Sequence, residues 1–238
     1  LLKSKQVSVL NQTPGAFYHL VSQELKCKTR DLRLKYVIFG GDALEPIKLK
    51  EWRTRYPRTQ LINMFGITET TVHVTFKEIT ETDIRDGLSN IGKPLPTLST
   101  YVLDPHQNLA PFGVAGELYV GGLGVARGYL NRPQLTAERF IDHPHKPGER
   151  LYRSGDLVSM RESGDMVYLG RIDHQVKVRG FRVELGDISS RLQKHSAVKE
   201  AVVMGRGENE GQYLCAYMVL HRHCDENELR DYMVRELP

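Results

Sequence analysis

Short apolar runs alternate with amphipathic stretches in the N-terminal part of the chain. Apolar residues at 7–10, 36–39 and 60–64 predict three buried strands. Apolar side chains at helical spacing predict a helix after each of the first two strands, and Pro14 and Pro46 suit the first turns of these helices. This alternation is typical of a parallel sheet with right-handed crossovers. Because ligands bind such sheets beyond the carboxyl ends of the strands, we expect a site in the loops that follow them.

The pattern changes near residue 90 to short strands separated by clusters of Asn, Asp, Gly and Pro. Such clusters mark tight turns, and the sequence from Glu162 to Asp165 predicts a hairpin. We therefore expect an α/β subdomain over residues 1–88 and a small, mostly antiparallel β subdomain over residues 89–172.

A third pattern begins after Arg171. It predicts a strand pair bent at Gly180, a helix, two paired strands and a final helix. Asp225, with Glu228 three residues later, is the expected N-terminal cap of that last helix. Residues 173–238 are thus predicted to form a compact α+β unit.

Composition and charge exclude several classes of function. The 238-residue chain has a net charge of +4 with its Lys and Arg residues scattered, which argues against a nucleic-acid-binding face. No apolar run approaches the about 20 residues that a membrane span needs. The cysteines (Cys27, Cys215 and Cys224) lack CxxC spacing, which favours a reducing cytoplasm and no structural zinc.

The C-terminal part contains a possible metal motif, and the ends of the chain suggest a fragment. His221, His223 and Cys224 could form a local metal clip, although a solvated loop between a strand and a helix is the favoured alternative. The chain begins without Met and is neither a signal peptide nor a natural start, so we expect it to be a piece of a longer protein.

Most of the run Asn63–Phe76 ("NMFGITETTVHVTF") has the apolar character of a buried strand, yet it carries hydroxyls around Glu69, in a Gly-x-Thr-Glu turn expected after the strand. At a ligand edge the hydroxyl of Thr68 can donate to phosphate oxygens, and a carboxylate is the hard oxygen ligand that Mg²⁺ prefers alongside phosphates. The alternative is a threonine-rich strand end with a solvated glutamate.

Two further stretches permit nucleotide chemistry. Four glycines at positions 121, 122, 124 and 128 allow close backbone approach, although tight turns are the commoner use of such glycines and no Walker signature is present. Asp156, after a Ser-Gly turn, can accept hydrogen bonds from both hydroxyls of a ribose, or can instead close a turn.

Residues 170–188 concentrate charge where the second and third patterns meet. A linker whose charges pair differently in two arrangements suits a hinge, whereas an exposed, charged strand is the alternative. The charged residues in question are Arg171, Asp173, Lys177, Arg179 and Arg182.

Together and in this order, these motifs resemble the later core motifs of the adenylate-forming superfamily, and more narrowly the adenylation domains of non-ribosomal peptide synthetases. "GGDAL" (40–44) and "LNQTP" (10–14) fit the same pattern. The resemblance implies the adenylate-forming enzyme fold in part. Residues 1–88 would end the large α/β core subdomain, 89–172 would form the β-rich core subdomain, and 173–238 would form an incomplete, mobile C-terminal subdomain.

The resemblance implies an enzyme that uses ATP and Mg²⁺ to convert an amino acid into an aminoacyl-adenylate. The aminoacyl group would pass to the phosphopantetheine thiol of a peptidyl carrier protein domain, with a condensation domain also in the parent chain. The phosphate loop and the lysine that meets the α-phosphate would lie outside this chain, so the chain alone is expected to be inactive. An acyl- or aryl-CoA ligase and a non-catalytic carrier-docking fragment are the alternatives.

The resemblance also assigns roles to individual residues. Asp173 would be the hinge, Gly180 would line the pantetheine channel, and Glu69 would hold the metal. The catalytic candidates are Thr68, Glu69 and Lys177. The nucleotide would be bound by Gly41, Asp42, Ala43, Asn63, Met64, Phe65, Gly66, Thr68, Asp156, Tyr168 and Arg171.

Pocket positions resembling the threonine-selecting pattern predict the substrate. Asn11 and His73 can hydrogen-bond a β-hydroxyl, and unmatched buried polar groups would reject valine. The alternative for His73 is a core histidine whose hydrogen bonds are satisfied. The pocket would comprise Asn11, Ile38, Gly40, Met64, Val72 and His73.

Overall fold

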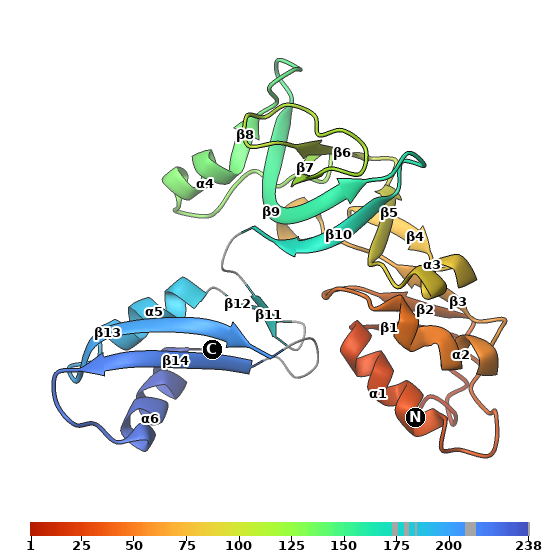
Figure 1. Cartoon of the computed structure of the whole chain (residues 1–238), viewed down its shortest axis with the longest axis horizontal. Helices are drawn as coiled ribbons and strands as arrows, with labels where there is room; N and C mark the ends of the chain where they lie inside the picture. The colour runs from red at the N-terminus through yellow and green to blue at the C-terminus, as the bar shows by residue number, and fades with distance from the viewer. Residues whose placement is uncertain (173–175, 179–180, 184, 208–212, 238) are drawn as a thin grey trace. The chain divides into compact units, whose positions relative to one another are not determined.

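The computed structural model divides the chain into two compact units, each with its own elements (Figure 1). The large unit is Leu1–Ile172 and the small unit is Asp173–Pro238. The structure describes residues 1–172, 176–178, 181–183, 185–207 and 213–237.

Three parallel strands open the large unit, as the hydrophobic pattern predicts. They are β1 (Val9–Gln12), β2 (Tyr36–Phe39) and β3 (Gln60–Asn63), paired in the order β1-β2-β3. Strand β1 begins at Val9, two residues after the start of the apolar run 7–10. The connecting helices are α1 (Pro14–Glu24), the 3₁₀ helix η1 (Pro46–Leu49) and α2 (Lys50–Arg55).

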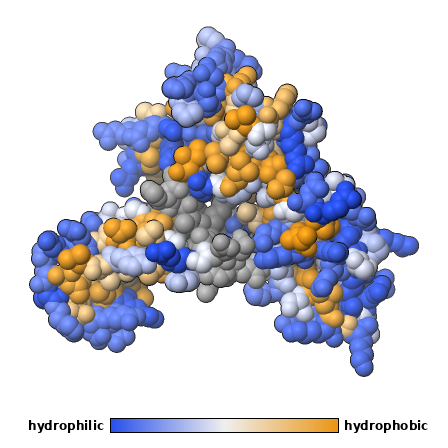
Figure 2. All heavy atoms as spheres, in the orientation of Figure 1, coloured by the Kyte–Doolittle hydropathy of each residue, from blue (hydrophilic) through white to orange (hydrophobic). Residues whose placement is uncertain are grey.

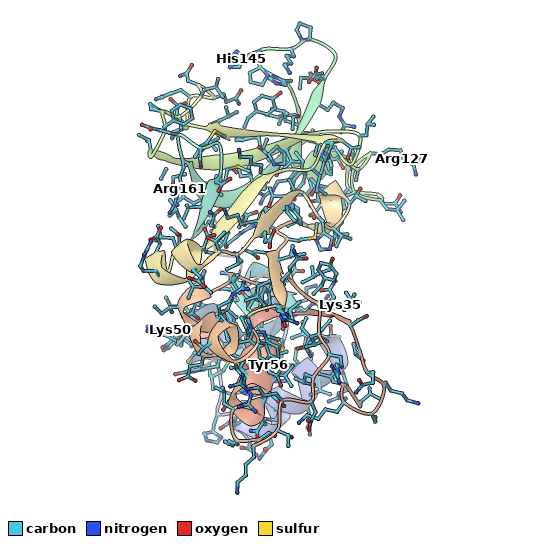
Figure 3. The ribbon with its side chains drawn as sticks, turned by 90° about the vertical axis from the view of Figure 1, so that its right-hand side faces the viewer. Lys35, Lys50, Tyr56, Arg127, His145 and Arg161 are labelled. Carbon is cyan, nitrogen blue, oxygen red and sulfur yellow. The ribbon has the colours of Figure 1, made fainter. Side chains whose placement is uncertain are left out.

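The helices cover one face of these strands. Phe17 of α1 and Trp52 of α2 are fully buried, with ring centroids 4.8 Å apart, and they pack in one apolar cluster with Val37, Phe39 and Leu61. Figure 3 marks α2 by Lys50 at its start and by Tyr56 just after its end. Because side chains alternate along a strand, Ile38 and Ile62 point to the opposite face, where they are only half-buried.

The sheet continues through antiparallel strands into the β-rich part. The strand order is β1-β2-β3-β4-β5-β10-β9-β7-β6, with β8 paired to β9. These elements are η2 (Thr68–Thr70), β4 (Thr75–Glu78), α3 (Glu81–Asp86), β5 (Asn90–Pro94), β6 (Leu98–Leu103), β7 (Ala115–Gly122), α4 (Pro133–Arg139), β8 (Phe140–Asp142), β9 (Arg150–Met160) and β10 (Met166–Arg171). The boundary near residue 88 stays a prediction, since strands on both sides of it pair in one sheet.

A buried polar network joins the two parts of this sheet. Asn90 is 1% exposed, and its amide donates to Asp83 Oδ1 at 2.9 Å and to Asp165 Oδ2 at 3.2 Å. Lys77 Nζ lies 3.0 Å from Asp165 and 3.6 Å from Asp83. Asn63 donates its own amide to the backbone oxygen of Asn90 at 2.8 Å. One lysine thus forms ion pairs with two carboxylates at this junction.

The turn predicted after the third strand is present, and the apolar run Asn63–Phe76 is strand only at its two ends. β3 ends at Asn63, a loop leads into η2, and β4 begins at Thr75. Thr71 and Val72 have φ angles of +65° and +66°, so the backbone reverses between the two strands. Phe65, Ile67 and Val74 are buried in this segment, whereas Val72 is exposed.

The small unit contains two antiparallel strand pairs and two helices. The elements are β11 (Val176–Val178), β12 (Phe181–Val183), α5 (Leu185–Gln193), β13 (Val198–Arg206), β14 (Tyr213–Leu220) and α6 (Glu226–Glu236). Leu192, Val203 and Leu229 bring α5, β13 and α6 into one core, while Figure 2 shows apolar side chains at the surface of this unit as well. Asp225 occupies the expected cap position of α6, but its side chain makes no capping hydrogen bond.

The predicted fold class is confirmed. The large unit combines a parallel α/β region with antiparallel β structure, and the small unit is α+β. Asp173 and Gly180, the predicted hinge and pantetheine residues, lie outside the described residues. Lys177 lies on β11.

Candidate active site

Glu69 lies in a tight turn at the carboxyl end of β3. The N–H groups of Thr70 and Val72 both donate to Ile67 O, at 3.1 and 3.0 Å, which closes the turn. Gly66 is required here, because a Cβ atom at that position would lie 2.0 Å from Val72 O. The local sequence therefore folds the Thr68–Glu69 pair out of the strand and against the β-rich part.

The Glu69 carboxylate accepts hydrogen bonds from two tyrosines. Tyr129 Oη donates to Glu69 Oε1 at 2.6 Å, and Tyr152 Oη donates to the same oxygen at 2.9 Å. Glu69 is 9% exposed. Burial, followed by the hydrogen bond to Glu69, raises the pKa of Tyr129 far above its ordinary value, so this hydroxyl stays protonated. The sequence analysis did not select Tyr129 or Tyr152 as partners of Glu69.

The glycine-rich loop after β7 fastens this turn. Ala126 N–H donates to Glu69 O at 2.9 Å, and Thr71 Oγ1 donates to Gly124 O at 2.7 Å. A Cβ atom on Gly124 would lie 3.1 Å from Thr70 O. The loop, which Arg127 marks in Figure 3, therefore packs against the Glu69 turn.

The residues around Glu69 fit a magnesium ion. A nearly buried carboxylate whose orientation is fixed by two donors is a hard oxygen ligand, and Mg²⁺ in nucleotide sites uses one or two carboxylates plus phosphate oxygens. Thr68 is exposed beside it, so its hydroxyl is accessible to a phosphate. When bound, the metal would supply positive charge to the phosphates.

Asp156 lies on β9, four residues after Tyr152. Since a strand rises about 3.3 Å per residue, at most about 13 Å of strand separates the two positions. Asp156 is fully buried, and Arg171 Nη1 contacts its Oδ1 at 3.1 Å and Ser154 O at 3.0 Å. The structure thus brings Asp156 and Arg171 together; their contact with a ribose stays a prediction.

A bulge shapes β9 just before Asp156. Leu157 pairs with Glu117 while Arg153 pairs with Tyr119, so β9 carries two extra residues at this point. Glu117 accepts hydrogen bonds from Arg153 Nε at 2.9 Å and from Gly155 N–H at 3.1 Å, and Gly155 has a φ of +74°. Bulges of this kind re-aim side chains beside binding sites. The sequence analysis did not select Glu117, because no local motif distinguishes it from other glutamates in strands.

Other predicted nucleotide residues occupy three places in the large unit. Phe65 and Tyr168 lie together, with ring centroids 5.9 Å apart. Gly41, Asp42 and Ala43 form the turn after β2, in which Gly41 has a φ of +86° and Ala43 N–H donates to Asp42 Oδ1 at 2.8 Å. Asn63 is buried, and its amide is directed to the junction network.

Most of the predicted substrate pocket shares one face of the parallel strands. Asn11 pairs with Ile38, and Gly40 follows Ile38 by two positions. A Cβ atom on Gly40 would lie 3.4 Å from Met64 O and 3.6 Å from His73 Cε1. Ile62, the register partner of Ile38, lies on the same face and was not predicted, although alternation along β3 contains that signal.

His73 and Val72 differ in their surroundings. His73 Nδ1 is buried and finds no hydrogen-bond partner among the residues that the structure describes, which argues against a satisfied core histidine. Val72 is 60% exposed. His73 is therefore available to hydrogen-bond a ligand at the end of β2 and β3.

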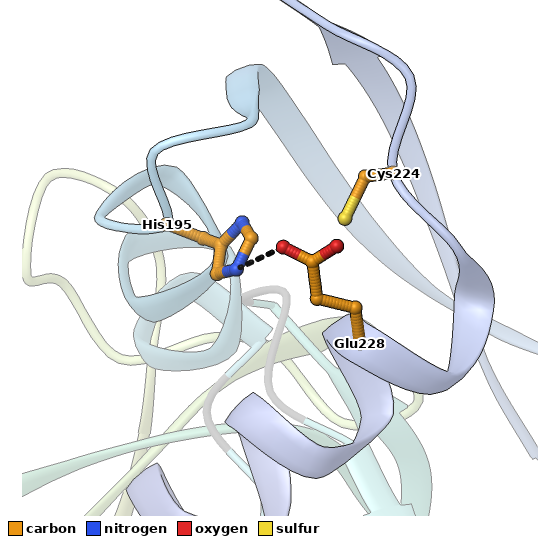
Figure 4. Close-up of side chains that lie close together, drawn as sticks. All are labelled: His195, Cys224 and Glu228. Atoms are coloured by element: carbon orange, nitrogen blue, oxygen red, sulfur yellow. Dashed lines mark ion pairs between the residues drawn. The ribbon is translucent and has the colours of Figure 1, made fainter.

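A second polar cluster, in the small unit, has two features that oppose metal binding. His195, Cys224 and Glu228 place ligand atoms within 4.8 Å of one another (Figure 4). However, His195 Nδ1 accepts the N–H of Ala197 at 3.3 Å, so the neutral ring carries its proton on Nε2, facing Glu228. Burial and the hydrogen bond to Glu228 raise the pKa of the Cys224 thiol, which keeps it protonated. His221 and His223, from the possible metal clip, are exposed.

Within the described ranges, no helix combines the length and apolar character that a bilayer crossing requires.

Comparisons with known proteins agree with this geometry. The dimodular nonribosomal peptide synthase of Bacillus subtilis (strain 168) is 49% identical over 247 residues, covering all of this chain and 10% of the relative. Tyrocidine synthase 3 of Brevibacillus parabrevis is 43% identical over 241 residues, with 100% and 4% covered. This chain thus spans about a tenth or less of the length of these relatives.

Two solved structures share the fold over the whole chain. One is NpsA-ThdA, an artificially fused adenylation–PCP di-domain from Klebsiella oxytoca, with a TM-score of 0.80, 26% identity and 44% of that chain covered. The other is holo-PA1221, a protein containing adenylation and PCP domains, with a TM-score of 0.87, 26% identity and 40% covered. The model of the AMP-binding enzyme family matches residues 1–130, and that of the AMP-binding enzyme C-terminal domain matches residues 187–238. The chain therefore belongs to the AMP-binding enzyme family.

Proposed function

We propose that this chain is part of an adenylation domain of a non-ribosomal peptide synthetase. The protein that contains it would activate an amino acid with ATP and Mg²⁺ and transfer it to the phosphopantetheine thiol of a carrier protein. Support comes from the peptide synthetases among its relatives and from the PCP domains in both structural neighbours. A condensation domain and a cytoplasmic location, predicted from the sequence, belong to the same proposal.

The observation that carries this proposal is the placement of Glu69 and Asp156. Glu69 is hydrogen-bonded to Tyr152 of β9, and Asp156 follows on the same strand. A metal and phosphates at Glu69, and a ribose at Asp156 and Arg171, would lie at distances that one nucleotide can span. Phe65 and Tyr168 would flank the nucleoside, and Gly41–Ala43 would contact the base.

Threonine is the substrate that we propose for the pocket. Ile38 and Met64 would pack its methyl group, and His73 and Asn11 would bind its hydroxyl. Support comes from the shared face of these positions and from the buried Nδ1 of His73. A ligand hydroxyl would satisfy this nitrogen, whereas valine would leave it unpaired at a cost of about 1–3 kcal/mol.

The test is amino-acid-dependent exchange of pyrophosphate into ATP by the natural protein that contains this chain. Threonine should give the fastest exchange in a panel that includes valine, serine, fatty acids and aryl acids. Fastest exchange with another amino acid would refute the proposed threonine specificity but not the proposed adenylation activity. Exchange with fatty or aryl acids would favour a CoA ligase, and no exchange with any acid would refute the proposed function.

A further inference from the structure

We propose that Tyr129 is a positioning residue which, together with Tyr152, orients the Glu69 carboxylate for binding of the metal–nucleotide complex. This inference rests on the proposed function. The inference gives the glycine-rich loop after β7 a role in metal binding, in addition to its packing against the Glu69 turn.

The hydrogen-bond geometry gives both hydroxyls one task. Each tyrosine hydroxyl has a single proton to donate, and both lie within hydrogen-bond distance of Glu69 Oε1. The two hydroxyl oxygens are also within hydrogen-bond distance of each other, at 3.1 Å, so the two tyrosines and Glu69 form one hydrogen-bonded cluster. Hydrogen bonds to an ionised acceptor are roughly twice as strong as neutral ones. The pair therefore fixes the rotation of the carboxylate and favours its ionised form.

Tyr129 is itself held rigidly, which a positioning residue requires. Its N–H donates to Thr136 Oγ1 of α4 at 2.9 Å, and its ring lies 5.4 Å from that of Phe140, which in turn lies 4.9 Å from Tyr152. Gly128 has a φ of +147°, and a Cβ atom there would lie 2.5 Å from Thr136. Helix α4 and strand β8 thus fix the Tyr129 hydroxyl against Glu69.

Residues that orient a metal ligand influence affinity strongly. Loss of such a hydrogen bond typically weakens metal binding about 10- to 100-fold. Tyr129→Phe removes one oxygen atom and keeps the ring that packs on Phe140. Its effect therefore reports on the hydrogen bond to Glu69 rather than on the core.

The test measures binding without turnover in the natural protein that contains this chain. Mn²⁺ would be titrated in the presence of α,β-methylene-ATP, with free Mn²⁺ followed by electron paramagnetic resonance. Tyr129→Phe should raise the Mn²⁺ dissociation constant at least about tenfold, and Tyr152→Phe should act in the same direction. Tyr101→Phe, which removes a hydroxyl that contacts Lys146 at 3.0 Å, is the matched control and should leave it within twofold.

A double-mutant cycle separates positioning from general structural damage. In a Glu69→Gln background, Tyr129→Phe should change the residual Mn²⁺ affinity by less than twofold, because its effect acts through the carboxylate. Two outcomes would overturn the inference: Tyr129→Phe weakens Mn²⁺ binding equally in the wild-type and Glu69→Gln backgrounds, or Tyr129→Phe binds Mn²⁺ with wild-type affinity. Neither outcome would contradict the proposed function, as long as the wild-type protein catalyses pyrophosphate exchange. Absence of exchange in the wild type would overturn the proposed function and this inference together.

Discussion

Replacing Asn90 by Ala should open the sheet where β5 meets β10. The side chain makes two hydrogen bonds to the carboxylates of Asp83 and Asp165 and accepts the N–H of Gly92 at 2.9 Å. A hydrogen bond to a charged group contributes about 1.5–3 kcal/mol and a neutral one about 1 kcal/mol. Because Lys77 still forms ion pairs with both carboxylates, the low ends of these ranges apply. The local free energy of opening should fall by about 4 kcal/mol.

Hydrogen exchange followed by mass spectrometry measures this quantity in a large protein. Amides of β5 and β10 in Asn90→Ala should exchange about a thousandfold faster than in the wild type at pH 7. Asn108→Ala is the matched control, since the exposed Asn108 amide donates to Asp104 Oδ2 at 3.3 Å in a turn outside this junction. If Asn90→Ala lowers the local free energy of opening by less than about 1 kcal/mol, the network does not hold β5 and β10 together as argued.

The same network predicts a pH dependence. Burial opposes ionisation of Asp83 and Asp165, but the hydrogen bonds and Lys77 outweigh it, so both pKa values are lowered. The ionised carboxylates therefore stabilise the fold above their ordinary pKa of about 4, and this contribution is lost as the pH falls through the lowered values. The difference between Asn90→Ala and the wild type should shrink below about pH 4; a constant difference would contradict this assignment.

Three other substitutions test the site through pyrophosphate exchange. Gly66→Ala places a methyl group 2.0 Å from Val72 O, which displaces the Glu69 turn and should reduce the rate about 100-fold. His73→Leu removes the group proposed to bind the substrate hydroxyl, and should lower the threonine-to-valine ratio of kcat/KM about tenfold. Glu117→Ala releases Arg153 and the β9 bulge, and should raise KM for ATP about three- to tenfold with a smaller effect on kcat.

Controls and refuting outcomes differ among these variants. Gly186→Ala, in helix α5, meets nothing within 4 Å and should retain wild-type exchange. Wild-type activity in Gly66→Ala would show that the turn tolerates displacement. An unchanged threonine preference in His73→Leu would remove this residue from the pocket. A fall in kcat alone in Glu117→Ala would argue against a role of the bulge in binding the nucleotide.

The elements that local patterns control were predictable. The run at 36–39 matches β2, because four consecutive apolar residues suit a buried parallel strand. Pro14 and Pro46 open their helices as expected, since proline fits the first turn. The pairing of Asp156 with Arg171 follows from the hairpin of β9 and β10, which turn residues indicate.

The features that distant contacts control were not predictable. The Glu69 turn was expected, but its partners were not, because Tyr129, Ala126 and Gly124 follow more than fifty positions later in the chain. Asp225 sits at a helix start, yet Glu228 is directed to Arg222 at 3.0 Å and to His195 at 3.6 Å instead of completing a capping box. Local motifs identify such residues as candidates, but their partners depend on packing between segments far apart in the chain.

The position of β10 constrains how the large unit folds during translation. β10 is the last strand of that unit, yet it inserts between β5 and β9 in the middle of the sheet. While a ribosome is still translating residues before 166, the nascent chain has unpaired edges on β5 and on β9, where strands of other molecules can add. Premature termination in this interval should therefore yield aggregates, whereas release after residue 171 should allow the sheet to close.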